Sequence, residues 1–193
     1  MRQYATRDEW LAAATEGLRA DFEAARSPIP EKIRSSFGFP HGGGGGKRKT
    51  IGQHWDAKQI GDGIGQIYIS PTLDDPIEIL ATLVHELVHA AVGSECGHKG
   101  EFKRSAQAIG LVGKMTATTA GETLTARLSA LADDLGPLPH SKLTPNSRKK
   151  QGTRMLKAEC VPCEYIVRLT RKMIDQHGCP ICPACLDQMI ESV

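Results

Sequence analysis

Three histidines and a glutamate lie in one short stretch, with residue types and spacing suited to binding a metal ion. The stretch reads TLVHELVHAAVGSECGHKGEFKR, from Thr82 to Arg104. On a helix, residues four apart share a face, so His85 and His89 present two imidazoles to one point. Glu86 lies about 100° around the axis from His85, so its carboxylate can reach a zinc-bound water as general base without coordinating the ion. This H-E-x-x-H pattern predicts a hydrolytic zinc site.

The third zinc ligand must come from the chain beyond the helix, because a catalytic zinc takes three protein ligands and keeps one position open. Gly93 and Gly97 permit a tight reversal that returns His98 to the first two histidines. We favour His98, with the carboxylates of Glu95 and Glu101 as alternatives. The metzincin pattern does not fit, since it would place its third histidine three residues earlier, at position 95.

The helix that carries these residues has clear boundaries in the sequence. Asp75 is a good N-cap, Pro76 suits the first helical position, Glu78 suits a capping box, and Gly93 suits the C-terminal end. Its apolar residues predict burial whether or not a metal binds. Buried histidines and a buried glutamate need partners, however, because unpaired buried polar groups are costly, and a metal ion would partner all three.

The remaining periodicity predicts further helices and strands around this helix. We expect helices over residues 7–25, 100–109 and 121–135, and strands over 32–39, 51–55 and 65–71. The last two strands should form an antiparallel pair. An extended substrate is expected to pair with 65–70 as an edge strand.

A run of glycines between the first two strands could suggest a phosphate-binding loop. That loop requires glycine, four residues, then Gly-Lys-Ser/Thr. Here Arg48 follows Gly46 and Lys47, and His41 stands where the first glycine is required. We therefore predict a flexible hairpin loop and no nucleotide site.

The stretch HELVHAAVGSECGHKGEFKR resembles the SprT-like zinc metalloproteases, in particular their compact bacterial and phage members. The resemblance covers residues 31–189. It implies a zincin domain followed by a zinc ribbon, with His85, His89 and His98 on a catalytic zinc and Glu86 as catalytic base. It also implies a link to DNA, since eukaryotic members degrade proteins crosslinked to DNA. The chain departs from the pattern at Lys99, which separates His98 from the next glycine.

The end of the chain contains five of the six cysteines. Cys160/Cys163 and Cys182/Cys185 form two C-x-x-C pairs separated by 18 residues, a spacing typical of a four-cysteine zinc site. Two such knuckles joined by a β-hairpin make a zinc ribbon, which needs its metal to fold. Cys179 with Cys182 is an alternative second pair, and the family resemblance favours Cys182/Cys185. The cofactors expected are one catalytic and one structural zinc.

Basic residues concentrate in the same region. Up to Leu138 the chain has 15 Lys and Arg against 17 Asp and Glu, and from Pro139 onward it has 9 against 5. Basic side chains beside an aromatic suit contact with a polyanion, and DNA is the partner we favour. The predicted nucleic-acid-binding residues are Arg148, Lys149, Lys150, Arg154, Tyr165, Arg168, Arg171 and Lys172.

The expected fold class is α+β. A zincin-like domain with a small antiparallel or mixed sheet and helices should occupy residues 1–138, followed by a basic flexible linker over 139–156 and a small β zinc ribbon over 157–193. The charged N-terminus lacks a signal-peptide core, and no apolar run is long enough to span a membrane. We expect a cytoplasmic monomer, located in the host cytoplasm if the chain is encoded by a phage.

The predicted function is therefore a zinc-dependent endopeptidase of SprT-like type that acts on DNA-associated proteins. The alternative is a non-catalytic nucleic-acid-binding or transcription-associated protein with two structural zinc sites. Glu86 discriminates between them, because a purely structural site has no use for a carboxylate beside its first histidine and would have a fourth protein ligand.

Overall fold

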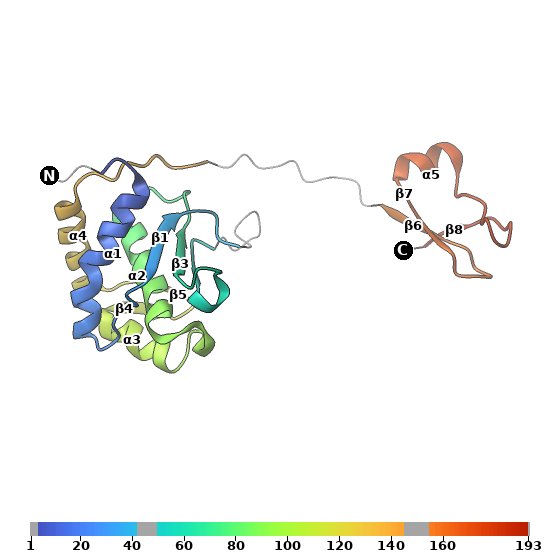
Figure 1. Cartoon of the computed structure of the whole chain (residues 1–193). Helices are drawn as coiled ribbons and strands as arrows, with labels where there is room; N and C mark the ends of the chain where they lie inside the picture. The colour runs from blue at the N-terminus through green and yellow to red at the C-terminus, as the bar shows by residue number, and fades with distance from the viewer. Residues whose placement is uncertain (1–3, 42–49, 145–154, 193) are drawn as a thin grey trace. The chain divides into compact units, whose positions relative to one another are not determined.

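The chain folds into two compact units that both combine helices and strands. The computed structural model describes residues 4–41, 50–144 and 155–192. An N-terminal unit spans Met1–Pro145 and a C-terminal unit spans Asn146–Val193 (Figure 1). The predicted α+β class is therefore confirmed. Within the described ranges, none of the helices combines the length and apolar character needed to cross a membrane.

The N-terminal unit contains four α-helices and five strands in its described part. In chain order they are α1 (Arg7–Ala24), β1 (Ile33–Phe37), β2 (Gly52–Trp55), β3 (Gly65–Ile69), α2 (Pro76–Val92), α3 (Glu101–Ile109), β4 (Leu111–Lys114), β5 (Ala117–Ala120) and α4 (Glu122–Leu135). The predicted helices and the three predicted strands are present with small shifts at their ends. The β4–β5 hairpin was not predicted from the sequence.

The main sheet has the strand order β1-β3-β2. Strand β2 runs antiparallel to β3, as predicted, whereas β1 runs parallel to it. The prediction that residues 65–70 form an edge strand is wrong, because β3 is hydrogen-bonded on both sides. Its burial agrees with a central position, since Ile67 and Ile69 are fully buried on the face covered by helices. Among the described strands of this sheet, β2 is the edge nearest α2, which packs on it.

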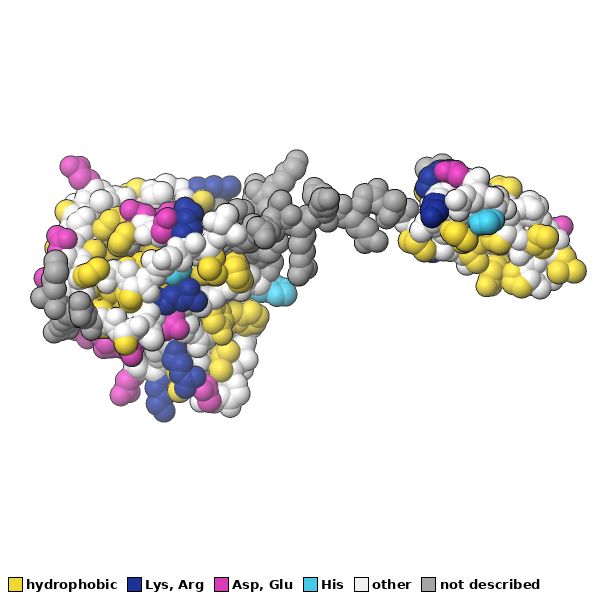
Figure 2. Space-filling view, turned by 90° about the horizontal axis from the view of Figure 1, so that it is seen from above, with side chains coloured by type: hydrophobic (Ala, Val, Ile, Leu, Met, Phe, Trp, Pro, Cys, Tyr) yellow, Lys and Arg dark blue, Asp and Glu magenta, His cyan; other side chains and the backbone are white. Residues whose placement is uncertain are grey.

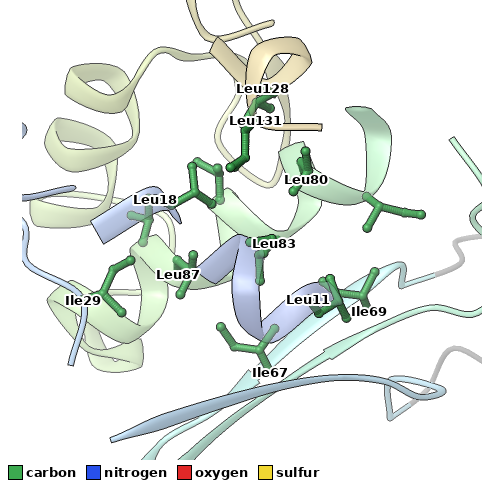
Figure 3. Close-up of a cluster of buried hydrophobic side chains, with 14 of the residues drawn as sticks. Leu11, Leu18, Ile29, Ile67, Ile69, Leu80, Leu83, Leu87, Leu128 and Leu131 are labelled. Carbon is green, nitrogen blue, oxygen red and sulfur yellow. The ribbon is translucent and has the colours of Figure 1, made fainter. Parts of the chain in front are cut away.

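One hydrophobic core joins the sheet to the helices. Side chains from α1, α2 and α4 belong to one buried cluster with Ile67 and Ile69 of β3 (Figure 3). Helix α2 contacts β2, β3, α3 and α4, so it is the helix that the rest of the unit surrounds. The fully buried residues on α2 are Ile79, Leu80, Leu83, Val84, Leu87 and Val88. The metal-binding pattern is therefore carried by the most tightly held helix of the unit.

The first part of the predicted linker packs on the N-terminal unit. The ring of His140 stacks on Phe37 at 4.6 Å between centroids, and its Nε2 lies 3.0 Å from the carbonyl oxygen of Leu73. The backbone N–H of Leu143 donates to the carbonyl of Pro71 at 2.8 Å. Residues 140 and 143 of the predicted linker thus contact the N-terminal unit through a histidine ring and a backbone group, which composition alone does not reveal. Residues 145–154 and the glycine run over 42–49 lie outside the described residues.

The C-terminal unit contains a three-stranded antiparallel sheet and one short helix. Its elements are β6 (Leu156–Glu159), β7 (Ile166–Leu169), α5 (Arg171–His177) and β8 (Ile190–Ser192), with the strand order β7-β6-β8. The expected hairpin is β6–β7, which has the first cysteine pair at its turn. Helix α5 was not expected. It begins because the Thr170 hydroxyl caps it, accepting from the backbone N–H of Met173 at 3.3 Å.

We predict that Leu83→Ala destabilises the N-terminal unit by about 2–5 kcal/mol, because Leu83 is fully buried in α2 and truncation leaves a cavity. The matched control is Leu143→Ala, at a leucine that is 44% exposed, with an expected cost of about 0.5 kcal/mol. Urea unfolding followed by circular dichroism measures both. Equal losses would contradict the burial assigned to α2.

Candidate metal centres and the cavity beside α2

Three imidazoles converge in the N-terminal unit. Nε2 of His98 lies 3.2 Å from Nε2 of His85 and 3.2 Å from Nε2 of His89. One ring nitrogen can donate only one hydrogen bond, so hydrogen bonding alone does not account for both short approaches. Two nitrogens on a tetrahedral zinc with bonds of 2.0–2.1 Å lie about 3.3 Å apart. The donor atoms therefore have the type and spacing that a zinc ion requires.

Helix α2 and the turn after it place these rings. The side chain of Asp75 accepts from the backbone N–H of Glu78 at 2.7 Å and starts the helix, and Gly93 ends it with φ 84°. Gly97 has φ 54°, a conformation that favours glycine, and allows the chain to return at His98. Glu95 and Glu101, the alternative third ligands, are not part of the cluster that the described residues form.

Two contacts from outside the cluster hold its rings in place. Thr118 of β5 has its hydroxyl oxygen 2.8 Å from Nδ1 of His85. The ring of His89 lies against the fully buried Phe102, with centroids 4.3 Å apart and planes at 35°.

Burial lowers the pKa of His85 to about 4 and that of His89 to about 3, with further contributions from neighbouring histidines. Both rings are therefore neutral near pH 7, which is the form that binds a metal.

Glu86 is buried beside the cluster, with 6% of its surface exposed. Burial raises its pKa to about 8, and the backbone N–H of His54 opposes that rise. Its carboxylate fits only because residue 52 has no side chain. A Cβ on Gly52 would lie 2.6 Å from Oε1 of Glu86 and 2.7 Å from Cγ2 of Thr82. Strand β2 and helix α2 can approach this closely because Gly52 faces Glu86.

A cavity of about 600 Å³ opens beside the cluster. Its walls come from β2 with the two residues before it, from α2, from the turn over 94–98, and from residues 116–118 at the start of β5. The three histidines and Glu86 all line it. Among the described residues the histidine cluster contains no fourth metal-ligating side chain. A metal held there would face the cavity with a coordination position available to a small molecule.

Gly52, Phe102 and Thr118 are site residues that the sequence motifs did not predict. Phe102 was within the predicted helix after the third histidine, and its aromatic side chain was a visible candidate for packing. The segment VGKMTATTA is rich in β-branched residues with a turn in the middle, a pattern that indicates a hairpin. That signal would have placed Thr118 on a strand. Its contact with His85 joins residues 33 positions apart in the chain, so a local pattern does not reveal it.

Four cysteines converge in the C-terminal unit. The Sγ atoms of Cys160, Cys163, Cys182 and Cys185 all lie within 4.8 Å of one another. In both pairs the backbone N–H after the second cysteine donates to the carbonyl of the first, from Glu164 to Cys160 at 2.8 Å and from Leu186 to Cys182 at 2.9 Å. The two turns thus form matching knuckles. Cys179 packs against the cluster but is not one of its four sulfurs.

The thiol pKa values show why this cluster favours a cation. Backbone N–H groups, chiefly that of Cys185, lower the pKa of Cys182 to about 7. The thiol of Cys163 raises the pKa of Cys185 to about 12. The cysteines therefore differ in how readily they ionise, and a bound cation favours the ionised form of all four because the thiolate is the metal ligand.

The predicted nucleic-acid-binding residues are only partly within the described residues. Arg148, Lys149, Lys150 and Arg154 lie outside them. Tyr165 and Arg168 are exposed. Arg171 forms ion pairs with Glu191 at 2.6 Å and Asp175 at 3.6 Å. Arg171 and Lys172 are the first two residues of α5, which begins at the Thr170 cap.

Residues 155–192 contain four basic and five acidic side chains, so the basic character of the C-terminal region comes from outside them. Hydrophobic side chains gather on one side of the C-terminal unit instead (Figure 2). The most exposed are Val161, Ile181 and Leu186, at 68%, 61% and 77%. The described residues of the C-terminal unit therefore carry no net positive charge.

A scan against protein-family models and searches of curated proteins and of solved structures found no match to this chain. The resemblance to SprT-like proteases therefore rests on the residues of the two metal motifs.

We predict that Glu86→Gln changes how the stability of the metal-free protein depends on pH. The folded-state pKa of Glu86 is raised from 4.5 to about 8, so its stabilising contribution is complete below about pH 4.5 and is lost as the pH rises through about 8. Glutamine does not titrate. The Tm of Glu86→Gln relative to wild type should therefore rise between about pH 5 and about pH 9. Parallel shifts of both proteins across that range would contradict the burial of an ionisable Glu86.

We predict that Cys182→Ser removes one equivalent of bound metal and unfolds the C-terminal unit, since that unit is too small to fold without its site. Cys179→Ser is the matched control, because Cys179 is near the same cluster without belonging to it. It should keep both the metal and the fold. Elemental analysis with circular dichroism makes the measurement, and loss of metal in Cys179→Ser would contradict the assignment of the four ligands.

Proposed function

We propose that the protein is a zinc-dependent endopeptidase of SprT-like type. In this proposal the N-terminal unit is a zincin-like protease domain and the C-terminal unit is a zinc ribbon. The observation that carries the proposal is the position of Glu86. It is a buried carboxylate beside three convergent histidines, in the wall of a cavity. A structural metal site gains nothing from this arrangement, whereas hydrolysis needs a base there.

In the proposed mechanism the three histidines bind the metal and Glu86 transfers protons. His85, His89 and His98 would hold a zinc ion through their Nε2 atoms. When bound, zinc supplies Lewis-acid polarisation of a peptide carbonyl and of a water molecule. Glu86 accepts the proton from the attacking water and returns it to the leaving amine. Its carboxylate lines the same cavity as the three histidines, which places it where both proton transfers occur.

The substrate in this proposal is an extended peptide segment that lies along β2. Residues 50–54 line the cavity, and β2 is hydrogen-bonded to β3 on one side. Its other side can pair with an added strand through main-chain groups. In this proposal β2, and not residues 65–70 as predicted from the sequence, is the edge strand that pairs with the substrate. Main-chain pairing would carry the peptide bond past Glu86 with little dependence on the substrate's side chains.

DNA-associated proteins are the proposed substrate class. The region from Pro139 onward has nine basic and five acidic residues, a balance that favours contact with a polyanion. Tyr165 and Arg168 are exposed on the C-terminal unit, where they could add stacking and phosphate contact. A ribbon that contacts DNA would bring the protease domain to proteins bound on it. We propose a cytoplasmic monomer for this role.

The alternative is a non-catalytic nucleic-acid-binding protein with two structural zinc sites. The four-cysteine cluster fits that function as well as it fits the protease. The histidine cluster does not, since it has three ligating side chains among the described residues and faces a cavity. A closed structural site would have four.

Glu86→Gln tests the proposal. The variant should keep two zinc ions per chain and lose cleavage of a DNA-binding substrate protein by about 10²–10⁴-fold, since glutamine cannot transfer the proton. His85→Ala is the companion variant, and it should lose both cleavage and one zinc. Cleavage is measured by gel electrophoresis with and without DNA.

Two results would count against the protease. Unchanged cleavage by Glu86→Gln would reject the role of Glu86. Absence of cleavage by the zinc-loaded wild type, with single-stranded and double-stranded DNA both tested, would favour the non-catalytic alternative.

A further inference from the structure

The histidine cluster has one hydrogen-bond partner that belongs to neither α2 nor the turn after it. Thr118 is on β5, which contacts α2, and its hydroxyl oxygen lies 2.8 Å from Nδ1 of His85. Within the described residues, the other hydrogen bonds to the three rings join the rings to one another. A metal on Nε2 requires the proton to be on Nδ1, so His85 must then donate and Thr118 accept.

The β4–β5 hairpin holds this hydroxyl in a fixed place. Leu111 at the start of β4 is 1% exposed and belongs to the hydrophobic core. Thr118 is directly opposite Gly113 in the register of the hairpin, and the N–H of Gly121 closes it by donating to the carbonyl of Gly110 at 2.9 Å. A hydrogen-bonding group that is anchored in this way loses little freedom when it orients a ligand.

The rings of His85 and His89 are held differently. His89 is packed against Phe102, and its Nδ1 is buried without a hydrogen-bond partner among the described residues. Packing fixes the plane of that ring but does not select which nitrogen carries the proton. His85 has a hydroxyl at Nδ1 that can accept the Nδ1–H, the tautomer that a cation on Nε2 requires.

We propose that Thr118 is a positioning residue of the metal centre: its hydroxyl accepts the Nδ1–H of His85 and so directs the Nε2 lone pair of that ring at the metal. Thr118 thereby sets the metal affinity of the histidine cluster without touching the metal. This inference rests on the zinc site of the proposed function, and it is independent of whether the protein cleaves peptides.

The test compares zinc affinity among threonine variants of the full-length chain. Thr118→Val keeps the shape and removes the hydroxyl, whereas Thr118→Ser keeps the hydroxyl. Thr119→Val is the matched control, since Thr119 is the next residue of the same strand and is exposed. Zinc bound per chain is measured against a series of buffered free-zinc concentrations. His85→Ala identifies which binding step belongs to the histidine cluster.

We expect Thr118→Val to weaken that step by about 10–100-fold, the range typical of lost outer-shell partners of metal ligands. Thr118→Ser should stay within about threefold of wild type, and Thr119→Val should match it. Tm values of the metal-free proteins check that each variant folds, and Thr118→Ala replaces Thr118→Val if the latter does not.

Wild-type affinity in Thr118→Val would overturn the inference. Equal weakening in Thr118→Val and Thr118→Ser would also overturn it, since the loss would then come from packing and not from the hydroxyl. A wild-type chain that binds zinc only at the cysteines would instead reject the histidine metal site itself, together with this inference. The two failures are therefore distinguishable.

Discussion

The convergence of three imidazole nitrogens on one point is the constraint on which the N-terminal unit depends. Neutral imidazoles gain little from such proximity by themselves, and protonated ones would repel. The arrangement is stable in the folded chain because α2 packs against the sheet and against two other helices, α3 and α4. Their packing holds His85 and His89 in place, and burial keeps both neutral. A cation at this point would be bound by all three nitrogens, and these bonds would stabilise the convergence of the rings.

Burial also raises the pKa of Glu86. A carboxylate beside water would be ionised well below neutral pH, whereas the pKa of this one is raised to about 8. Its position depends on the missing side chain of Gly52, which allows β2 to pack against α2 at that level. The strand that would present a peptide and the helix that would hold the base are thus in contact at one glycine. Replacing that glycine would affect both at once.

The local parts of this arrangement could be predicted from the sequence. The helix ends follow from Asp75 and Gly93, and the spacing of His85 and His89 follows from the helical repeat. The return of His98 was suggested by the two glycines before it. In the C-terminal unit, spacing placed the cysteines in pairs, and the matching knuckle turns distinguish Cys185 from Cys179. All of these signals lie within a few residues of the feature that they predict.

What could not be predicted depends on pairs of segments far apart in the chain. Strand β3 was taken for an edge because its parallel pairing with β1 joins residues about thirty positions apart. The contact between Thr118 and His85 depends on where a hairpin packs, and the contacts of His140 depend on how residues 139–144 return to the sheet. Sequence periodicity indicates which face of an element is buried, but it does not indicate which distant residue covers that face.

Zinc K-edge X-ray absorption on the purified full-length chain tests the central claim most directly, because it reports the number and type of the metal's ligands. We expect two zinc ions per chain, one with four sulfur ligands at about 2.3 Å and one with three imidazole nitrogens at about 2.0–2.1 Å and an additional oxygen. The nitrogen contribution should disappear in His85→Ala while the sulfur contribution remains. A single zinc per chain with sulfur ligands alone would contradict it.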